Sequence, residues 1–286
     1  MAPLRGHAPE PVAAPARARP AWAWAPFAAA AAALVVALGA VASRGPAAAP
    51  AIVARDDAGR PLAAGAWVTA GDDAREVVLG AVGRVTVRPG ARVQVRALGA
   101  DLARLYLERG AIEASISAAA RPRLFQVDTG AGRCVDLGCR YVLTALPDGD
   151  AHVRVTSGRV AFEAGDREVY VPAGAEVTAR RDRGPGTPSF STAGAALREA
   201  LDAFDAARIG DPARLAAARR VADAARTEED LLPPWHWLTD PDADVARIAL
   251  DVLVARAGAP PGWTRPAGRP GAADREAFRA LLDAAW

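Results

Sequence analysis

The chain has 286 residues, with 35 basic and 33 acidic side chains and a net charge of +2. This near balance, without a long basic run, excludes the electrostatic footprint of a dedicated nucleic-acid-binding protein. Every basic residue other than His is Arg, so enzymes that depend on a P-loop, Schiff-base or other catalytic Lys are excluded, because those roles need an amine.

The first predicted element is a membrane-spanning helix over residues 20–43. This stretch carries no charge and is rich in Ala, Leu and Val, and it is long enough to cross about 30 Å of hydrocarbon as a helix. Trp22 and Trp24 stand near its amino end, where indole rings favour the headgroup level. Residues 1–19 are therefore predicted to form a short cytoplasmic tail.

The charges that flank the span favour an amino end inside the cell. Arg17, Arg19 and the terminal amine crowd one side, whereas Asp56 and Asp57 dilute the positive charge on the other. The bulk of the chain is then outside, carried by a single-pass anchor. The alternative is a cleaved signal peptide and a soluble exterior protein, because residues 40–42 have the small-x-small pattern of a processing site.

Residues 44–61 are predicted to be a linker rich in Pro and Ala, and residues 62–183 a β domain. Apolar and polar side chains alternate along short runs of this domain, as in strands that bury one face, and glycines recur between the runs. No long helical pattern interrupts them. The predicted fold is therefore all-β with antiparallel or coiled connections, in the form of a sandwich, a roll or a short solenoid. The alternating apolar positions include Val93, Val95, Ile112, Ala114, Ile116, Val153 and Val155.

Successive blocks of the β domain resemble the signature blocks of FecR-domain proteins. They read LERGAI at 107–112, RPRLFQVDT at 121–129, VDLGC at 135–139, VTSGRV at 155–160 and VPAG at 171–174. The order and spacing of the blocks make the resemblance more specific than any one of them.

The resemblance implies an inner-membrane regulator whose periplasmic domain senses an envelope event and whose cytoplasmic part controls an extracytoplasmic-function sigma factor. Residues 1–19 depart from that scheme, because a stretch rich in Pro, Ala and Arg cannot bury a core of its own. We therefore expect a FecR-type periplasmic sensor or regulator that acts by binding an envelope protein or a sigma-factor system. The alternative is an envelope interaction module without sigma-factor control.

Residues 184–192 are predicted to be a second linker, and residues 193–286 a helical region of four or five short helices. Leu197, Leu201 and Phe204 share one helical face.

Three sequence signals mark predicted helix starts in this region. Asp211-Pro212 and Asp240-Pro241 each offer an N-cap followed by Pro, and Thr227 with Asp230 resembles a capping box. The spacing of the two Asp-Pro pairs would suit a HEAT-like arrangement of paired helices.

The block LPPWHWL at 232–238 resembles a tail found on a subset of FecR-domain proteins. Trp235 and Trp237 within it would form a partner-binding surface if they were exposed, because Trp dominates protein interfaces. The alternative places both indoles in the core of a small helical bundle.

Cys134 and Cys139 are the only two cysteines of the chain. In one extended strand their Cα atoms would lie about 16 Å apart, whereas a disulfide needs less than about 7 Å. A turn at Gly138 could close this gap. Two outcomes stay open: a disulfide, or two reduced and mostly buried thiols.

Asp128-Thr129-Gly130 resembles the catalytic motif of retroviral-type aspartic proteases, in which two carboxylates share a proton across a dimer. The same residues fall within a FecR-type block, where the Asp closes a turn without chemistry. The three histidines lack the spacing of metal ligands. We therefore expect no enzymatic activity and no cofactor.

Overall fold

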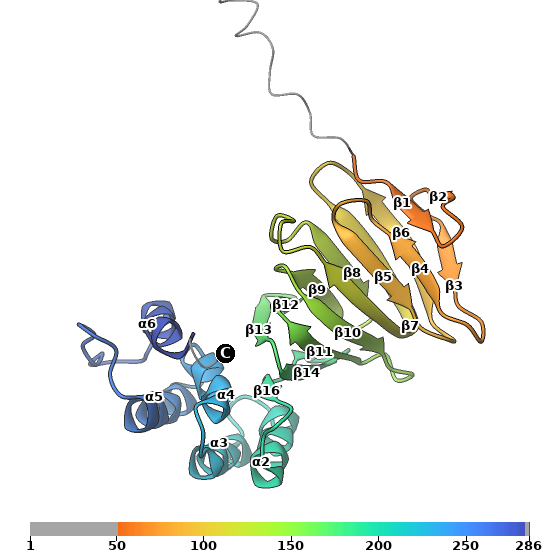
Figure 1. The fold of residues 1–286 in the computed structure, drawn as a ribbon. Helices are drawn as coiled ribbons and strands as arrows, with labels where there is room; N and C mark the ends of the chain where they lie inside the picture. Colours follow the sequence, from red (N-terminus) through yellow and green to blue (C-terminus); the bar gives the residue numbers. More distant parts are fainter. Residues whose placement is uncertain (1–50, 284–285) are drawn as a thin grey trace, which may run out of the picture. The chain divides into compact units, whose positions relative to one another are not determined.

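The computed structural model describes residues 51–283 and 286 (Figure 1). These described residues make up one compact unit. The predicted tail and membrane span lie outside the described residues. Among the residues that are described, no helix has the length and apolar character needed to cross a membrane.

The β region consists of two sheets that share one long strand, β7. One sheet has the order β2-β1-β4-β5-β7-β10-β11-β14, with β15 and β16 both on β14, and the other has the order β3-β6-β7-β8-β9-β12-β13. All described pairings are antiparallel except that of β7 with β8. The strands are β1 (Ala54–Asp56), β2 (Pro61–Leu62), β3 (Trp67–Thr69), β4 (Arg75–Val78), β5 (Gly83–Val87), β6 (Arg92–Leu98), β7 (Ala103–Ile116), β8 (Phe125–Thr129), β9 (Gly132–Asp136), β10 (Arg140–Ala145), β11 (Ala151–Ser157), β12 (Arg159–Ala164), β13 (Arg167–Pro172), β14 (Ala175–Arg180), β15 (Gly184–Pro185) and β16 (Ser189–Phe190).

Strand β7 changes its buried face where it passes from one sheet to the other. In its first half the odd-numbered residues are buried, and in its second half the even-numbered ones are. The switch follows a β-bulge, because Arg92 pairs with Arg109 while Val93 pairs with Leu107, which leaves Glu108 as an extra residue. Gly110 follows the bulge with φ of 78°. The bulge and this glycine let one strand serve both sheets.

The inward-facing side chains of both sheets form the core, and the predicted alternation is confirmed. Every apolar position predicted from the alternation is buried. The prediction of an all-β domain without helical crossovers is also confirmed, since no helix interrupts residues 54–190. Large side chains such as Phe125, Tyr141 and Phe162 fill the space between the sheets.

The segment predicted as a linker at 184–192 is partly ordered as strand. Gly184 has φ of 76° and turns the chain back, so that β15 pairs with the end of β14. β16 then pairs with the start of β14, and Phe190 is buried. This stretch is therefore part of a sheet and does not simply connect two regions.

Five α-helices and one short 3-10 helix follow, in agreement with the predicted helical region. Leu197, Leu201 and Phe204 are buried on one face of the first of them. The HEAT-like arrangement stays a prediction. The elements are α2 (Ala195–Ala206), α3 (Pro212–Ala224), the 3-10 helix η2 (Glu229–Leu231), α4 (Leu232–Trp237), α5 (Ala243–Ala257) and α6 (Ala272–Leu282).

Two of the three predicted helix-start signals are confirmed. Asp211 caps α3, with its Oδ1 accepting from the Ala213 amide at 2.8 Å. Thr227 and Asp230 exchange hydrogen bonds as in a capping box. The prediction for Asp240 is wrong: α5 begins at Ala243 and its N-cap is Asp242, because Asp240 is engaged in a buried ion pair described below.

We predict that Gly110→Ala destabilises the chain by about 2 to 4 kcal/mol, as measured by chemical unfolding followed by circular dichroism. A Cβ at this position would lie 2.6 Å from the Cα of Ala91, in addition to the positive φ. Gly80→Ala is the matched control, because Gly80 also has a positive φ (58°) but nothing within 4 Å of the added Cβ. We expect about 1 kcal/mol there; equal losses for the two variants would contradict a steric role of Gly110.

Candidate functional site

A hollow of about 390 Å³ lies where the free edges of the two sheets meet. Strand β2 pairs only with β1, and β3 only with β6, among the described strands. Each is thus the last strand of its sheet, with backbone donors and acceptors along its other edge. The hollow is lined by Asp56, Arg60, Pro61, Leu62, Trp67, Val68, Thr69 and Arg75.

Trp67 is the exposed aromatic residue of this edge. It begins β3 and is 39% exposed. The Arg92 guanidinium carbon lies 4.0 Å from the centre of its ring, in a cation–π contact, and Glu108 holds that guanidinium at 3.0 Å. The indole is therefore presented to solvent by a fixed support.

Two ion pairs form the rim of the hollow. Arg75 binds Asp57 through two hydrogen bonds of 2.6 and 2.9 Å, and these lower the pKa of Asp57. Arg60 binds Asp56 at 2.8 Å, and this hydrogen bond lowers the pKa of Asp56 against the effect of its burial. The rim charges are paired with one another, so the recognition features that remain are the strand edges and the indole.

This combination of features suits the binding of another protein in an extended conformation. A segment added to a free edge gains main-chain hydrogen bonds, while side chains on alternate positions fill nearby hollows. Trp and Arg are also the residues that dominate binding energy at interfaces. Sequence reasoning missed the site, although the order Trp67-Val68-Thr69 has the alternation that predicts an outward-facing indole.

Trp235 and Trp237 are not part of a surface in the structure. They are only 2% and 4% exposed, which agrees with the alternative that placed them in a helical core. The Trp235 Nε1 donates to the Arg275 carbonyl at 2.8 Å, and the Trp237 Nε1 donates to the Thr187 hydroxyl at 3.1 Å. Each indole thus has a buried partner for its one polar atom.

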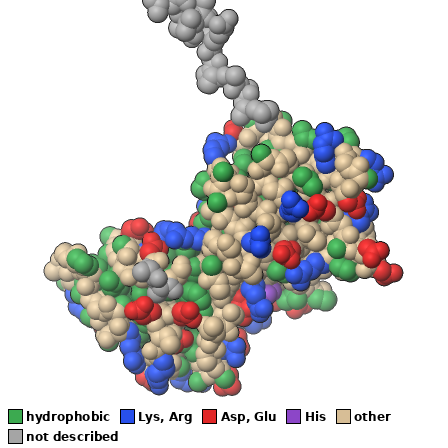
Figure 2. Space-filling view, in the orientation of Figure 1, with side chains coloured by type: hydrophobic (Ala, Val, Ile, Leu, Met, Phe, Trp, Pro, Cys, Tyr) green, Lys and Arg blue, Asp and Glu red, His purple; other side chains and the backbone are tan. Residues whose placement is uncertain are grey.

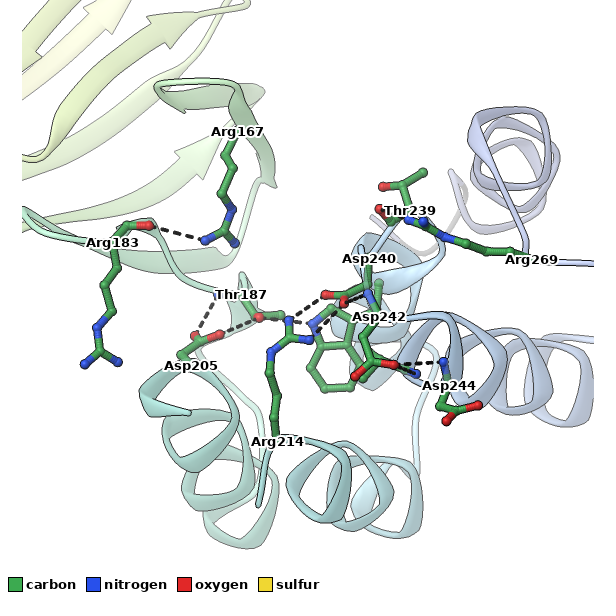
Figure 3. A network of polar contacts seen from close by, with 12 residues as sticks. Arg167, Arg183, Thr187, Asp205, Arg214, Thr239, Asp240, Asp242, Asp244 and Arg269 are labelled. Atoms are coloured by element: carbon green, nitrogen blue, oxygen red, sulfur yellow. Dashed lines mark hydrogen bonds and ion pairs between the residues drawn. The ribbon is translucent and has the colours of Figure 1, made fainter. Parts of the chain in front are cut away.

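A polar network joins the helices to the segment after β15 (Figure 3), and the indole of Trp237 bonds one member of it, Thr187. Asp205 of α2 accepts from the amide and hydroxyl of Thr187 at 2.7 and 2.8 Å. Arg214 of α3 forms a two-pronged pair with Asp240 at 2.8 and 2.6 Å, and both side chains are 8% exposed. Such a pair is costly to break, because the remaining charge would be buried alone.

Cys134 and Cys139 are both free and buried. Cys134 lies on β9, and Cys139 follows the turn at Gly138, which has φ of 93°. The Cys139 thiol donates to Asp136, which also accepts from the Gly138 amide at 2.8 Å. Burial raises the pKa of both thiols and of Asp136, which disfavours the reactive thiolate. A disulfide between the two stays a prediction.

Asp128 lies at the end of β8, directly opposite Arg133 of β9. The Arg133 Nε donates to its Oδ1 at 2.6 Å. Thr129 closes the hairpin, because its hydroxyl bonds the Gly132 carbonyl and accepts from the Ala131 amide. The Asp-Thr-Gly motif therefore forms an ion-paired β-turn in this chain.

His236 of α4 lies against β13, the last strand of its sheet. Its Nε2 donates to the Tyr170 carbonyl at 2.8 Å. Burial lowers the pKa of this imidazole to about 3, so it is neutral at pH 7. A helix side chain thus covers part of an edge that would otherwise face solvent.

We predict that His236 makes the fold sensitive to acid. The unfolded imidazole takes up a proton below about pH 6.5 whereas the folded one resists it, so stability is unaffected above that pH and falls as the pH is lowered toward 3. His236→Gln should make this decline shallower by up to about 1.4 kcal/mol per pH unit in urea unfolding. His152→Gln is the control, because the pKa of His152 is also lowered by burial but Glu176 opposes the shift. An unchanged acid limb in His236→Gln would contradict the prediction.

Comparison with known proteins does not assign the chain to a family. No protein-family model matches the chain, and no curated protein matches its sequence. Two crystal structures of a "putative anti-sigma factor" from Parabacteroides distasonis ATCC 8503 are similar to 48% of the chain, each with 15% identity and a TM-score of 0.39. The chain covers 64% and 65% of those two chains, less than two thirds of either.

Proposed function

We propose that the chain is a FecR-type regulator of the bacterial envelope, anchored in the inner membrane by residues 20–43. Its β and helical regions lie in the periplasm and act by binding protein. The regulated target is an extracytoplasmic-function sigma-factor system. In this proposal the chain reaches that system by binding a partner protein.

The positions of the FecR-like blocks in the fold support this assignment. LERGAI contains the bulge and bend of β7, and VDLGC forms the end of β9 with the turn that follows. VTSGRV forms the connection between β11 and β12. Gly158 in this block lies so close to the preceding one that a Cβ would be 2.1 Å from the Gly138 carbonyl oxygen. The blocks therefore correspond to bends, turns and close contacts of the backbone.

The observation that carries the proposal is the free edge at β2 and β3 with its exposed indole. An extended segment of the partner would pair with β3 and place an apolar side chain in the hollow beside Trp67. Asp128 has no catalytic role in this proposal, since its carboxylate is paired with Arg133. The second candidate function is an envelope interaction module that uses the same edge without sigma-factor control.

The first experiment tests the predicted topology. Alkaline phosphatase fused after Trp286 should be active, because this enzyme folds only in an oxidising compartment. A reporter that works only in the cytoplasm should be silent at the same position. The opposite pattern of activity would contradict the periplasmic assignment.

The second experiment tests regulation and the binding edge together. A strain that lacks the chain should show changed transcription of the genes of one sigma factor, measured by RNA sequencing. Trp67→Ala should fail to restore the normal pattern, because it removes the indole from the edge. Ile209→Ala, which removes an apolar side chain that is 66% exposed in the helical region, should restore it.

The outcomes separate the two candidate functions. No transcriptional change in the strain without the chain would contradict the regulator and favour the interaction module. A normal pattern in the strain with Trp67→Ala would show that the edge is not the binding site. Circular dichroism of both variants checks that each remains folded.

A further inference from the structure

Two guanidinium groups converge on one tyrosine ring between β13 and α6. The guanidinium carbon of Arg159 lies 5.7 Å from the centre of the Tyr170 ring, and that of Arg279 lies 5.1 Å from it. Arg159 begins β12 and Arg279 belongs to α6. Their side chains are 39% and 31% exposed, so a solute can reach them.

Neither guanidinium makes a hydrogen bond to a carboxylate in the described part of the chain. The nearest acid to Arg159 is Asp283, whose Oδ1 is 3.7 Å away, and the same oxygen is 3.8 Å from Arg279. Glu276 lies 3.9 Å from Arg279. These separations exceed hydrogen-bonding distance. Both guanidiniums therefore lie near the same Asp283 oxygen without a hydrogen bond to it, and their N–H groups can donate to a ligand.

Two further polar groups near this ring lack a hydrogen-bond partner among the described residues. The Tyr170 hydroxyl and the Trp286 Nε1 are buried and make no hydrogen bond with any described residue. Trp235 contacts both rings, at centroid distances of 6.0 Å to Tyr170 and 5.4 Å to Trp286. Buried polar atoms are nearly always hydrogen-bonded in native proteins, so the Tyr170 hydroxyl is available to donate to an acceptor.

Asp283 occupies an unfavourable position for an acid. It is the C-cap residue of α6, where the helix dipole disfavours negative charge. Its side chain is 45% exposed. Burial raises the pKa of the nearby Tyr170 phenol, and the charge of Asp283 adds to this effect, whereas Arg159 and Arg279 oppose it. A carboxylate that is held weakly at this position can be displaced by an oxyanion that bonds the guanidiniums directly.

We propose that Arg159, Arg279 and Tyr170 form a binding site for an oxyanion, either phosphate or carboxylate, and that Asp283 is its built-in competitor. The two arginines supply charge-assisted hydrogen bonds, and the tyrosine hydroxyl donates a third. The site is far along the sheet from Trp67, since β3 and β13 are the opposite ends of one strand order, and it does not depend on the proposed function.

The test is a titration of the full chain in detergent with inorganic phosphate and, separately, with acetate. Binding is followed by calorimetry and by tryptophan fluorescence, since Trp235 and Trp286 lie in the cluster. We expect a dissociation constant of about 1 mM for the preferred anion. The stronger of the two responses identifies the class of oxyanion.

Variants assign the response to the site. Arg159→Gln and Arg279→Gln should each weaken binding at least about tenfold, the loss expected for one charge-assisted hydrogen bond. Tyr170→Phe should weaken it about threefold, and Asp283→Asn should strengthen it by removing the competitor. Arg96→Gln and Tyr106→Phe are matched controls, because Arg96 stacks over Tyr106 at 4.7 Å elsewhere in the β region.

The proposal is overturned if neither anion produces heat or a fluorescence change up to about 20 mM. It is also overturned if Arg279→Gln binds as well as Arg96→Gln. Weaker binding in Asp283→Asn would eliminate the competitor role. Should an arginine variant fail to fold by circular dichroism, the comparison of Tyr170→Phe with Tyr106→Phe decides the outcome.

Discussion

The β region depends on one strand that changes face in its middle. A regular strand keeps its alternation throughout and can bury only one set of side chains. In β7 the extra residue Glu108 shifts the alternation by one, so the first half serves one sheet and the second half serves the other. Gly110 follows the bulge with a positive φ, and only Gly fits there because a side chain would collide with Ala91. Both sheets then close over a common core.

The helical region is attached by polar contacts as well as by packing. His236 bonds a carbonyl of β13, and the indole of Trp237 reaches Thr187 after β15. Arg214 and Asp240 hold the helices to one another in a buried pair. These contacts give hydrogen-bond partners to polar groups that would otherwise be buried without one. The segment at 184–192 is part of this attachment, because β15 and β16 both pair with β14.

The alternation of residues such as Val93 and Val153 was readable from the sequence, because a period of two is a local property. The bulge at Glu108 was not, since it depends on how β6 and β7 align. Asp240 followed by Pro has the local signature of an N-cap. The sequence does not show that Arg214, 26 positions earlier, binds the Asp240 carboxylate. The outward direction of Trp67 could be inferred from its neighbours. Its place on a free edge could not, because strand pairing is set over long distances.

The two ends of the sheet that contains β3 and β13 differ in a way that limits self-association. At β13 the helix α4 occupies the flank through His236, whereas β3 has no described strand beyond it. Edge-to-edge growth of a ribbon needs two open ends on every molecule. Because His236 already engages β13, edge-to-edge pairing through this sheet would use β3 and would join two chains. The helical region thereby opposes the growth of a continuous β-ribbon through this sheet.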